Sequence, residues 1–277
     1  MRLKIILILA VAATAAGCGG DGTKNEEIVA AFYPVAFAAQ QVAPPGAEVV
    51  NLTPPGVEPH DLELKPSDVS KLHSAEHVLL LGHGFQPAIE SAAGHGDRVV
   101  RLLDTSGLQR HGDDPHVWLD PARYALIIER IAAVLDRPDA ARPLLTRLRT
   151  LDGEYRAGLR DCEHHEIVTS HEAFGYLAER YGLTQVAIEG LSPEAEPTPQ
   201  RLRHVVDVVR STGATTVFFE TLVSPRIAKT VARESGARTA VLDPIEGLTP
   251  AAERRGADYF TVMRSNLSAL RSALGCR

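Results

Sequence analysis

The sequence predicts an α/β fold in which two similar lobes, each built on a parallel sheet, are joined by a long connecting helix. Short runs rich in β-branched residues alternate with segments of helical periodicity in both halves of the 277-residue chain. This alternation is typical of parallel α/β architecture. Between the halves, residues 121–160 show helical periodicity and almost no strand signal. We therefore expect lobes over residues 27–120 and 161–277, with a ligand cleft between them.

The chain begins with the features of an export signal. Arg2 and Lys4 supply positive charge, residues 5–13 form an apolar run, and residues 15–17 are small. The apolar run is shorter than the ~20 residues that span a bilayer as a helix. We therefore predict a cleaved signal peptide over residues 1–17.

Cys18 follows the small residues directly, and the segment resembles a bacterial lipobox, in which this cysteine is lipidated. An ordinary cleavage site with an incidental cysteine is the alternative. We favour lipidation because a free N-terminal thiol has no evident use outside the cell. Residues 18–26 would then form a flexible tether to the outer face of the cell membrane, on the periplasmic side if the envelope has two membranes.

In the first half, β-rich runs and helical segments follow one another regularly. The expected strands are residues 27–32, 47–52, 77–81 and 98–102, and the expected helices are residues 34–43, 66–74 and 85–93. Pro66 suits the first position of its helix, where the N–H that proline lacks would have no partner within the helix.

The middle and the second half complete the pattern. The Arg137-Pro138 step divides the long helical stretch in two, because the residue before a proline disfavours helical geometry. The expected strands that follow are residues 166–170, 185–188, 215–219 and 239–242, and the expected helices are residues 172–181, 199–211, 225–235 and 257–274. Thr198, directly before Pro199, is a suitable helix N-cap.

Composition narrows the class of protein. A hydrophobic content of 44% suffices for a packed core, and no second apolar run approaches the length that spans a membrane. The net charge of −6 disfavours a nucleic acid as partner and suits a protein that handles cations. We expect a monomer that is soluble apart from its lipid.

Two cysteines remain beyond Cys18. Cys162 and Cys276 lie in a chain expected outside the cytoplasm, where the oxidising environment favours a disulfide between them. Two buried free thiols are the alternative, and a thiolate metal site is disfavoured because histidines offer a better one.

Three of the 11 histidines lie at expected strand ends, where α/β lobes present residues to a cleft. His60 lies in a loop after the second strand, stiffened by two prolines and a glycine. His116 lies between the fourth strand and the helical stretch, and His171 follows the next strand directly. Asp243 follows the last expected strand. We predict that these four residues, two from each half, form one metal site.

Three imidazoles and one carboxylate suit tetrahedral Zn²⁺, whereas Mn²⁺ prefers more oxygen ligands. Glu58 or a water molecule could replace Asp243 at the fourth position. Three histidines on zinc also describe hydrolytic enzymes, which keep one position open for water. Because Asp243 would close that position and no general base is paired with a nucleophile, we expect no enzyme.

Five stretches of the chain, in this order, resemble the metal-binding lipoproteins of bacterial zinc and manganese ABC transporters. They are residues 56–64 (GVEPHDLEL), 114–121 (DPHVWLDP), 169–177 (TSHEAFGYL), 190–198 (GLSPEAEPT) and 241–247 (VLDPIEG). The resemblance covers nearly all of the mature chain. It implies two α/β lobes bridged by a single long helix, with metal-binding positions at His60, His116, His171 and the acidic residue 243.

The resemblance also implies a cargo and a partner. Zinc members are similar to this chain in having histidine at the position of His171, where manganese members usually have glutamate. We therefore expect a protein that binds Zn²⁺ and delivers it to a cognate ABC permease, with Mn²⁺ or Fe²⁺ delivery as the alternative. Many zinc members have a long loop rich in histidine and acidic residues before the second ligand, but here only residues 109–114 stand there. We interpret His111 and Asp113 as solvated loop residues.

Overall fold

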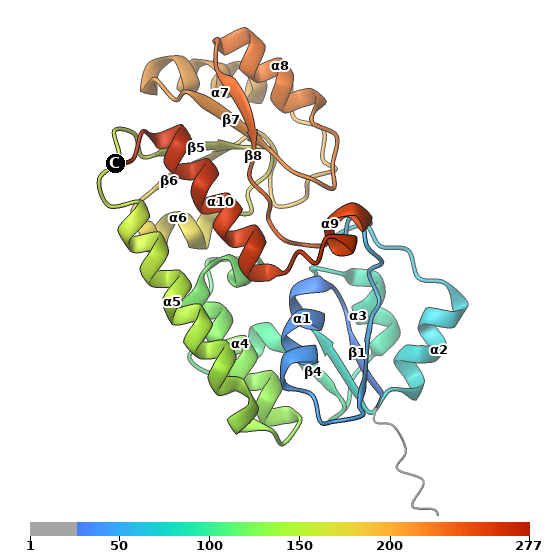
Figure 1. The fold of residues 1–277 in the computed structure, drawn as a ribbon. Helices are drawn as coiled ribbons and strands as arrows, with labels where there is room; N and C mark the ends of the chain where they lie inside the picture. Colours follow the sequence, from blue (N-terminus) through green and yellow to red (C-terminus); the bar gives the residue numbers. More distant parts are fainter. Residues whose placement is uncertain (1–26) are drawn as a thin grey trace, which may run out of the picture.

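The computed structural model of the protein describes residues 27–277. The predicted signal peptide, the tether and Cys18 lie outside the described residues. Two four-stranded sheets, in which every strand pairing is parallel, form the centres of two lobes, and long helices run between them (Figure 1). The predicted fold class is confirmed.

The N-terminal lobe contains the first sheet, with strand order β2-β1-β3-β4. Its strands are β1 (Glu27–Ala30), β2 (Glu48–Asn51), β3 (His77–Leu80) and β4 (Val99–Arg101), and its helices are α1 (Tyr33–Val42), α2 (Pro66–Ser74) and α3 (Pro87–Ala93). Pro66 begins α2 as predicted. Because the chain leaves β1 to one side and later returns to the other, the crevice of this sheet lies at the carboxyl ends of its strands.

Two helices and two short 3₁₀ turns connect the lobes. They are the 3₁₀ turn η2 (Val117–Leu119), α4 (Pro121–Val134), the 3₁₀ turn η3 (Pro138–Ala141) and α5 (Arg142–Gly158). The predicted break at the Arg137-Pro138 step is present. Asp120 caps α4 because its carboxylate accepts hydrogen bonds from the backbone N–H groups of Ala122 and Arg123. This cap fixes the start of α4 directly after the segment that contains His116.

The C-terminal lobe repeats the arrangement with strand order β6-β5-β7-β8. Its elements are β5 (Glu166–Thr169), α6 (Gly175–Tyr181), β6 (Thr184–Ala187), α7 (Pro199–Thr212), β7 (Thr216–Phe219), α8 (Arg226–Ser235), β8 (Arg238–Val241), α9 (Pro250–Arg254) and α10 (Tyr259–Leu274). Thr198 caps α7 through a hydrogen bond from Arg201 N, as predicted. The short helix α9 was not predicted. Helix α6 starts three residues later than predicted, because residues 170–174 are not helical and carry His171 into the interior.

One apolar core extends through both lobes. Phe32 after β1, Leu148 on α5, Tyr176 on α6 and Leu270 on α10 belong to the same buried cluster. A smaller cluster lies in the C-terminal lobe between its sheet and α7 and α8. Helix α10 lies beside α5 and runs from the side of the N-terminal lobe into the C-terminal lobe (Figure 1). The lobes are therefore joined by packed side chains as well as by the connector.

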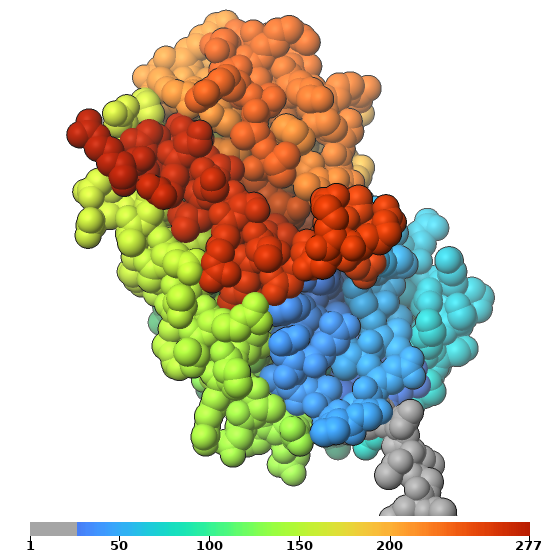
Figure 2. Space-filling view, viewed as in Figure 1, coloured from blue at the N-terminus to red at the C-terminus, as the bar shows by residue number. Residues whose placement is uncertain are grey.

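The surface between the lobes is also closed on the face drawn in Figure 2, where α9 packs against the N-terminal lobe. Gly56 N donates a hydrogen bond to Leu248 O across this junction at 2.8 Å. Gly56 has a φ of 86°, and a Cβ there would lie 3.0 Å from Pro250 Cδ, so glycine suits this close approach.

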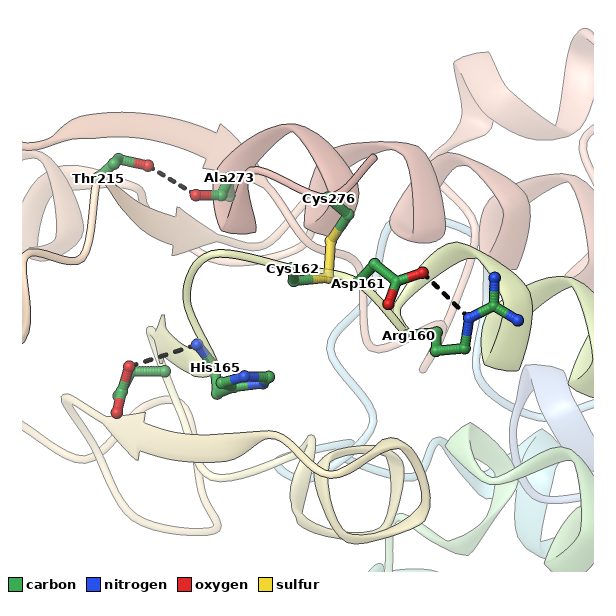
Figure 3. The surroundings of a disulfide bond; sticks show 8 residues. Arg160, Asp161, Cys162, His165, Thr215, Ala273 and Cys276 are labelled. Carbon is green, nitrogen blue, oxygen red and sulfur yellow. Dashed lines mark hydrogen bonds and ion pairs between the residues drawn. A yellow bond between two sulfur atoms is a disulfide. The ribbon is translucent and has the colours of Figure 1, made fainter.

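A disulfide between Cys162 and Cys276 joins the loop after α5 to the chain end after α10 (Figure 3). The predicted pairing is confirmed. Within residues 27–277, no helix combines the length and the apolar character that crossing a membrane requires.

Candidate metal centre

Four side chains from four separate segments converge between the lobes: His60, His116, His171 and Glu246. One nitrogen or oxygen atom of each lies within 4.8 Å of the corresponding atoms of the other three. We call these four residues the donor cluster. His116, His171 and Glu246 are buried, and the His60 side chain is only 10% exposed. The structure thus brings the three predicted histidines together.

Four of the separations between the donor atoms are close to the edge lengths of a zinc coordination tetrahedron. Glu246 Oε1 lies 3.2 Å from His60 Nε2, 3.1 Å from His116 Nε2 and 3.5 Å from His171 Nε2. The Nε2 atoms of His116 and His171 are 3.3 Å apart. A tetrahedron with bonds of ~2.0–2.2 Å has edges of roughly 3.3–3.6 Å, so these four separations suit a Zn²⁺ ion.

The loop after β2 presents His60. The side-chain amide of Gln86 donates to Pro59 O and to Thr53 Oγ1, both at 3.2 Å, and Thr53 Oγ1 donates to Ala31 O at the end of β1. Gln86 and Thr53 are buried. A buried amide therefore ties the backbone next to His60 to the sheet.

His116 precedes the turn η2, and its ring is oriented by Asp114. Asp114 Oδ1 lies 2.7 Å from His116 Nδ1 and also accepts a hydrogen bond from His116 N at 2.9 Å. A carboxylate at Nδ1 favours the tautomer in which Nδ1 carries the proton, so the lone pair of Nε2 faces the donor cluster.

His171 follows β5 and has an equivalent partner. Glu220, directly after β7, places Oε1 2.7 Å from His171 Nδ1. The side-chain amide of Gln185 donates to His171 O at 2.9 Å and to Thr169 Oγ1 at 2.8 Å. The Nε2 atoms of His116 and His171 thus face each other and Glu246 in a buried space, where a metal cation would take the place of the protons on these atoms.

The surrounding charges shift the titration of the cluster. Burial alone lowers the pKa of His116, but hydrogen bonds to Asp114 and Glu246 and their charges outweigh it and raise the pKa. Burial likewise lowers the pKa of His171, and the charge of Glu220 and its hydrogen bond outweigh it. Burial raises the pKa of Glu246, but its histidine partners hold that pKa well below the usual range. The centre therefore favours positive charge beside an ionised Glu246.

The structure corrects the prediction for Asp243, which lies outside the donor cluster. Asp243 Oδ2 accepts from Thr221 Oγ1 and Oδ1 accepts from Ile245 N, both at 2.7 Å. Glu246, three residues further on, supplies the acidic donor instead. The prediction chose Asp243 because it directly follows the expected strand 239–242, whereas the chain makes a turn there that carries Glu246 inward.

Glu58, the other residue considered for the fourth position, also lies outside the donor cluster. Glu58 belongs to the same loop as His60, but its Oε2 accepts from His60 N at 2.9 Å. Burial, followed by the charge of Glu246, raises the pKa of Glu58 to about 8. Glu246 was present in the stretch 241–247 of the sequence, and its acidic side chain near the expected strand end was the available signal.

The model of a protein family described as zinc-uptake complex component A, periplasmic, matches residues 28–273. The chain is 35% identical over 284 residues to the zinc-binding lipoprotein AdcA of Streptococcus pneumoniae strain R6, covering 91% of this chain and 56% of that protein. It thus spans about half the length of its streptococcal relatives. It is 30% identical over 308 residues to the high-affinity zinc uptake system protein ZnuA of Bacillus subtilis strain 168, covering 98% of this chain and 97% of that protein.

Among solved structures, the fold is similar to the crystal structure of the Zn(II)-bound ZnuA-like domain of Streptococcus pneumoniae AdcA. The TM-score is 0.75 at 33% sequence identity, and the match covers 90% of this chain and 99% of that chain.

Proposed function

The chain belongs to the zinc-uptake complex component A family, and from that premise we propose that it captures Zn²⁺ outside the cytoplasm and delivers it to an ABC-type importer. Members of this family are solute-binding components of ABC transporters and not enzymes. The observation that carries the proposal is the donor cluster, whose four atoms lie 3.1–3.5 Å apart in the pairs described above.

We assign the cargo to His60, His116, His171 and Glu246. Three imidazole nitrogens and one carboxylate oxygen are borderline-soft donors that suit Zn²⁺, whereas Mn²⁺ is better served by additional oxygens. Asp114 and Glu220 keep the two buried rings in the binding tautomer, so little reorganisation accompanies capture. Four protein donors also fill the position that a hydrolytic zinc site keeps open for water.

Metal titration tests this assignment. We expect the purified protein to bind one Zn²⁺ per chain and to prefer Zn²⁺ over Mn²⁺ at equal free concentration, measured by chelator competition and elemental analysis. Glu246→Ala and His171→Ala should each lower zinc affinity by more than the ~10–100-fold that loss of an outer partner costs. His83→Ala is the matched control, because His83 contacts Asp104 at the surface. A preference for Mn²⁺, or unchanged zinc binding in Glu246→Ala, would refute the assignment.

We propose further that Cys18 anchors the protein to the outer face of the membrane, as the lipobox-like segment before it suggests. The relative from Streptococcus pneumoniae is itself named a lipoprotein. Cys18→Ser should move the exported protein from the membrane fraction to the soluble extracytoplasmic fraction, without changing zinc affinity of the purified protein. Retention of the variant in the membrane fraction would contradict lipid anchoring.

A further inference from the structure

We infer that Asp243 and Asn266 are positioning residues of the metal centre, which hold the chain between β8 and α9 so that Glu246 enters the donor cluster. We call residues 243–246 the Glu246 turn. The inference rests on the proposed function, because it concerns how the acidic donor for Zn²⁺ is set in place. It gives Asp243 a role different from that of a ligand.

The Glu246 turn contains a backbone conformation that its sequence disfavours. Ile245 has a φ of 59°, in the left-handed region that β-branched residues rarely adopt. The other non-glycine residues with positive φ in the described part of the chain are His83 and Asp136, neither of which is β-branched. Ile245 is fully buried and directly precedes Glu246. The conformation must therefore be held by contacts from elsewhere in the fold.

Asp243 and Asn266 supply those contacts. The Asp243 carboxylate accepts from Ile245 N at 2.7 Å, which closes the turn, and from Thr221 Oγ1 at 2.7 Å. The Asn266 amide, on α10, accepts from Asp243 N at 2.9 Å and donates to Asp243 O at 2.7 Å. Asp243 and Asn266 are 9% and 2% exposed. The backbone N–H and C=O of Asp243 are thus both bonded to Asn266 of α10. The Asp243 side chain in turn holds Ile245, the residue before Glu246.

A third contact connects the same turn to another donor. Trp118 Nε1 donates to Pro244 O at 2.7 Å, and the Trp118 ring packs against His116 with centroids 5.2 Å apart. The Glu246 turn is therefore aligned with the segment that carries His116. This agrees with Glu246 Oε1 lying 3.1 Å from His116 Nε2.

A cavity, and not packed side chains, lies beside the start of the Glu246 turn. Thr221, Asp243 and Asn266 line a cavity of about 570 Å³ between the end of β8, α9 and α10. Without the hydrogen bonds, the chain could relax toward this cavity, Ile245 could return to a favourable φ, and Glu246 would move away from the histidines. The hydrogen bonds of Asp243 and Asn266, together with that of Trp118 to Pro244 O, are thus the contacts on which the position of Glu246 depends.

Two substitutions at one position separate a positioning residue from a ligand. In Asp243→Asn, the amide oxygen can still accept from Ile245 N and the NH₂ group can donate to Thr221, so we expect zinc affinity within a few-fold of wild type. In Asp243→Ala both contacts are lost, and we expect zinc affinity to fall by ~10–100-fold, the usual effect of losing an outer partner. Were Asp243 a zinc ligand, the neutral amide of Asn would fail nearly as badly as Ala.

The absorption spectrum of bound Co²⁺ reports the donor atoms directly, and a merely structural defect elsewhere would leave that spectrum unchanged. We expect the visible absorption of the Co²⁺ complex to change in Asp243→Ala and Asn266→Ala toward that of Glu246→Gln, because all three withdraw the same donor. Ser265→Ala is the matched control, since Ser265 lines the same cavity but bonds only its own helix. Its Co²⁺ spectrum and zinc affinity should equal those of wild type.

Thr221→Val provides a milder version that removes one hydrogen bond to Asp243, in case the alanine variants do not fold. It should shift the Co²⁺ spectrum in the same direction. Failure of wild type to bind zinc would reject the proposed function. If wild type binds zinc, the positioning role alone is overturned by any of three results. These are equal damage in Asp243→Asn and Asp243→Ala, wild-type affinity in folded Asp243→Ala, or an unchanged spectrum and affinity in Thr221→Val.

Discussion

The two fully buried histidines of the donor cluster each hydrogen-bond a carboxylate through Nδ1. Asp114 serves His116 and Glu220 serves His171, each at 2.7 Å. His60, which is partly exposed, shows no carboxylate at Nδ1 within the described part of the chain, and its ring packs against Phe85 with centroids 4.6 Å apart. The buried rings thus combine a fixed tautomer with compensating negative charge, which favours binding of a cation over binding of a neutral ligand.

We predict that Glu220→Gln lowers zinc affinity by ~10–100-fold while the protein still folds. The glutamine oxygen can accept from His171 Nδ1 but lacks the charge that makes the ring a stronger donor. Chelator competition measures the loss. Asp104→Asn is the control, because Asp104 pairs with Nε2 of the exposed His83, also 2.7 Å apart, outside the cluster. Equal affinities in wild type and Glu220→Gln would contradict this role.

Zinc binding should weaken as pH falls, and the decline should begin above the ordinary histidine pKa of ~6.5. The reason is that the pKa values of His116 and His171 are raised, so protons compete with the metal at higher pH than usual. Affinity measured between about pH 8 and about pH 5 tests this. A constant affinity down to about pH 6.5 would show that the carboxylates do not raise these pKa values.

The metal-free protein should show the opposite trend. A group whose folded pKa exceeds its unfolded pKa stabilises the fold below the unfolded value and loses that contribution as pH rises through the folded value. His116 and His171 behave so, as do Asp243 and Glu58, whose pKa values burial raises to about 6 and about 8. The Tm of metal-free protein should therefore fall between about pH 5 and about pH 8, and added zinc should restore it most at the upper end.

At the scale of elements, α10 links the metal centre to the rest of the C-terminal lobe. Asn266, near the middle of α10, bonds Asp243. Tyr155 of α5 donates a hydrogen bond to Met263 O of α10 at 2.6 Å. The disulfide at Cys276 joins the segment after α10 to the loop after α5. The position of α10 was predicted from sequence, but its contact with the Glu246 turn was not. The reason is that helical periodicity identifies a helix and its buried face without identifying the neighbour.

We predict that Cys162→Ser with Cys276→Ser lowers the free energy of unfolding by about 2 to 5 kcal/mol, because the bond closes a loop across a sequence separation of 114 residues. Zinc affinity should change little, since the donor cluster contains neither cysteine. Urea unfolding of both proteins, with and without a reductant, measures the difference. Reductant should destabilise wild type and leave the double variant unaffected; equal stability of the two oxidised proteins would contradict the prediction.

At the scale of the whole molecule, the lobes share one core and several buried hydrogen bonds. Besides Trp118 to Pro244, Tyr259 Oη donates to Trp118 O at 2.7 Å, and Gly56 N donates to Leu248 O at 2.8 Å. Opening the lobes widely would break these bonds and expose apolar side chains to water. The molecule is therefore suited to signalling metal loading through loops, and not through wide closure of a hinge.

We accordingly predict that the radius of gyration from solution scattering stays nearly constant when zinc binds, because the backbone of preorganised proteins moves by only about 1 Å or less on binding. Hydrogen exchange should instead become slower in residues 52–65 and in the Glu246 turn, which carry donors on loops. A larger contraction would show that the shared core separates in the metal-free protein. Glu246→Ala is the control in which zinc at the same concentration should leave both measurements unchanged.

The sequence by itself determined the strands, most helices, three of the donors and the disulfide, because each depends on local periodicity, turn chemistry or residue type. His60, His116 and His171 follow elements that could be recognised one at a time. Tertiary structure alone decided the acidic donor. Whether Asp243 or Glu246 faces the histidines depends on the left-handed Ile245, on Asn266, which lies 23 residues from Asp243, and on His60, which lies 186 residues from Glu246. A local pattern carries no information on contacts of that separation, and these contacts select the residue that completes the site.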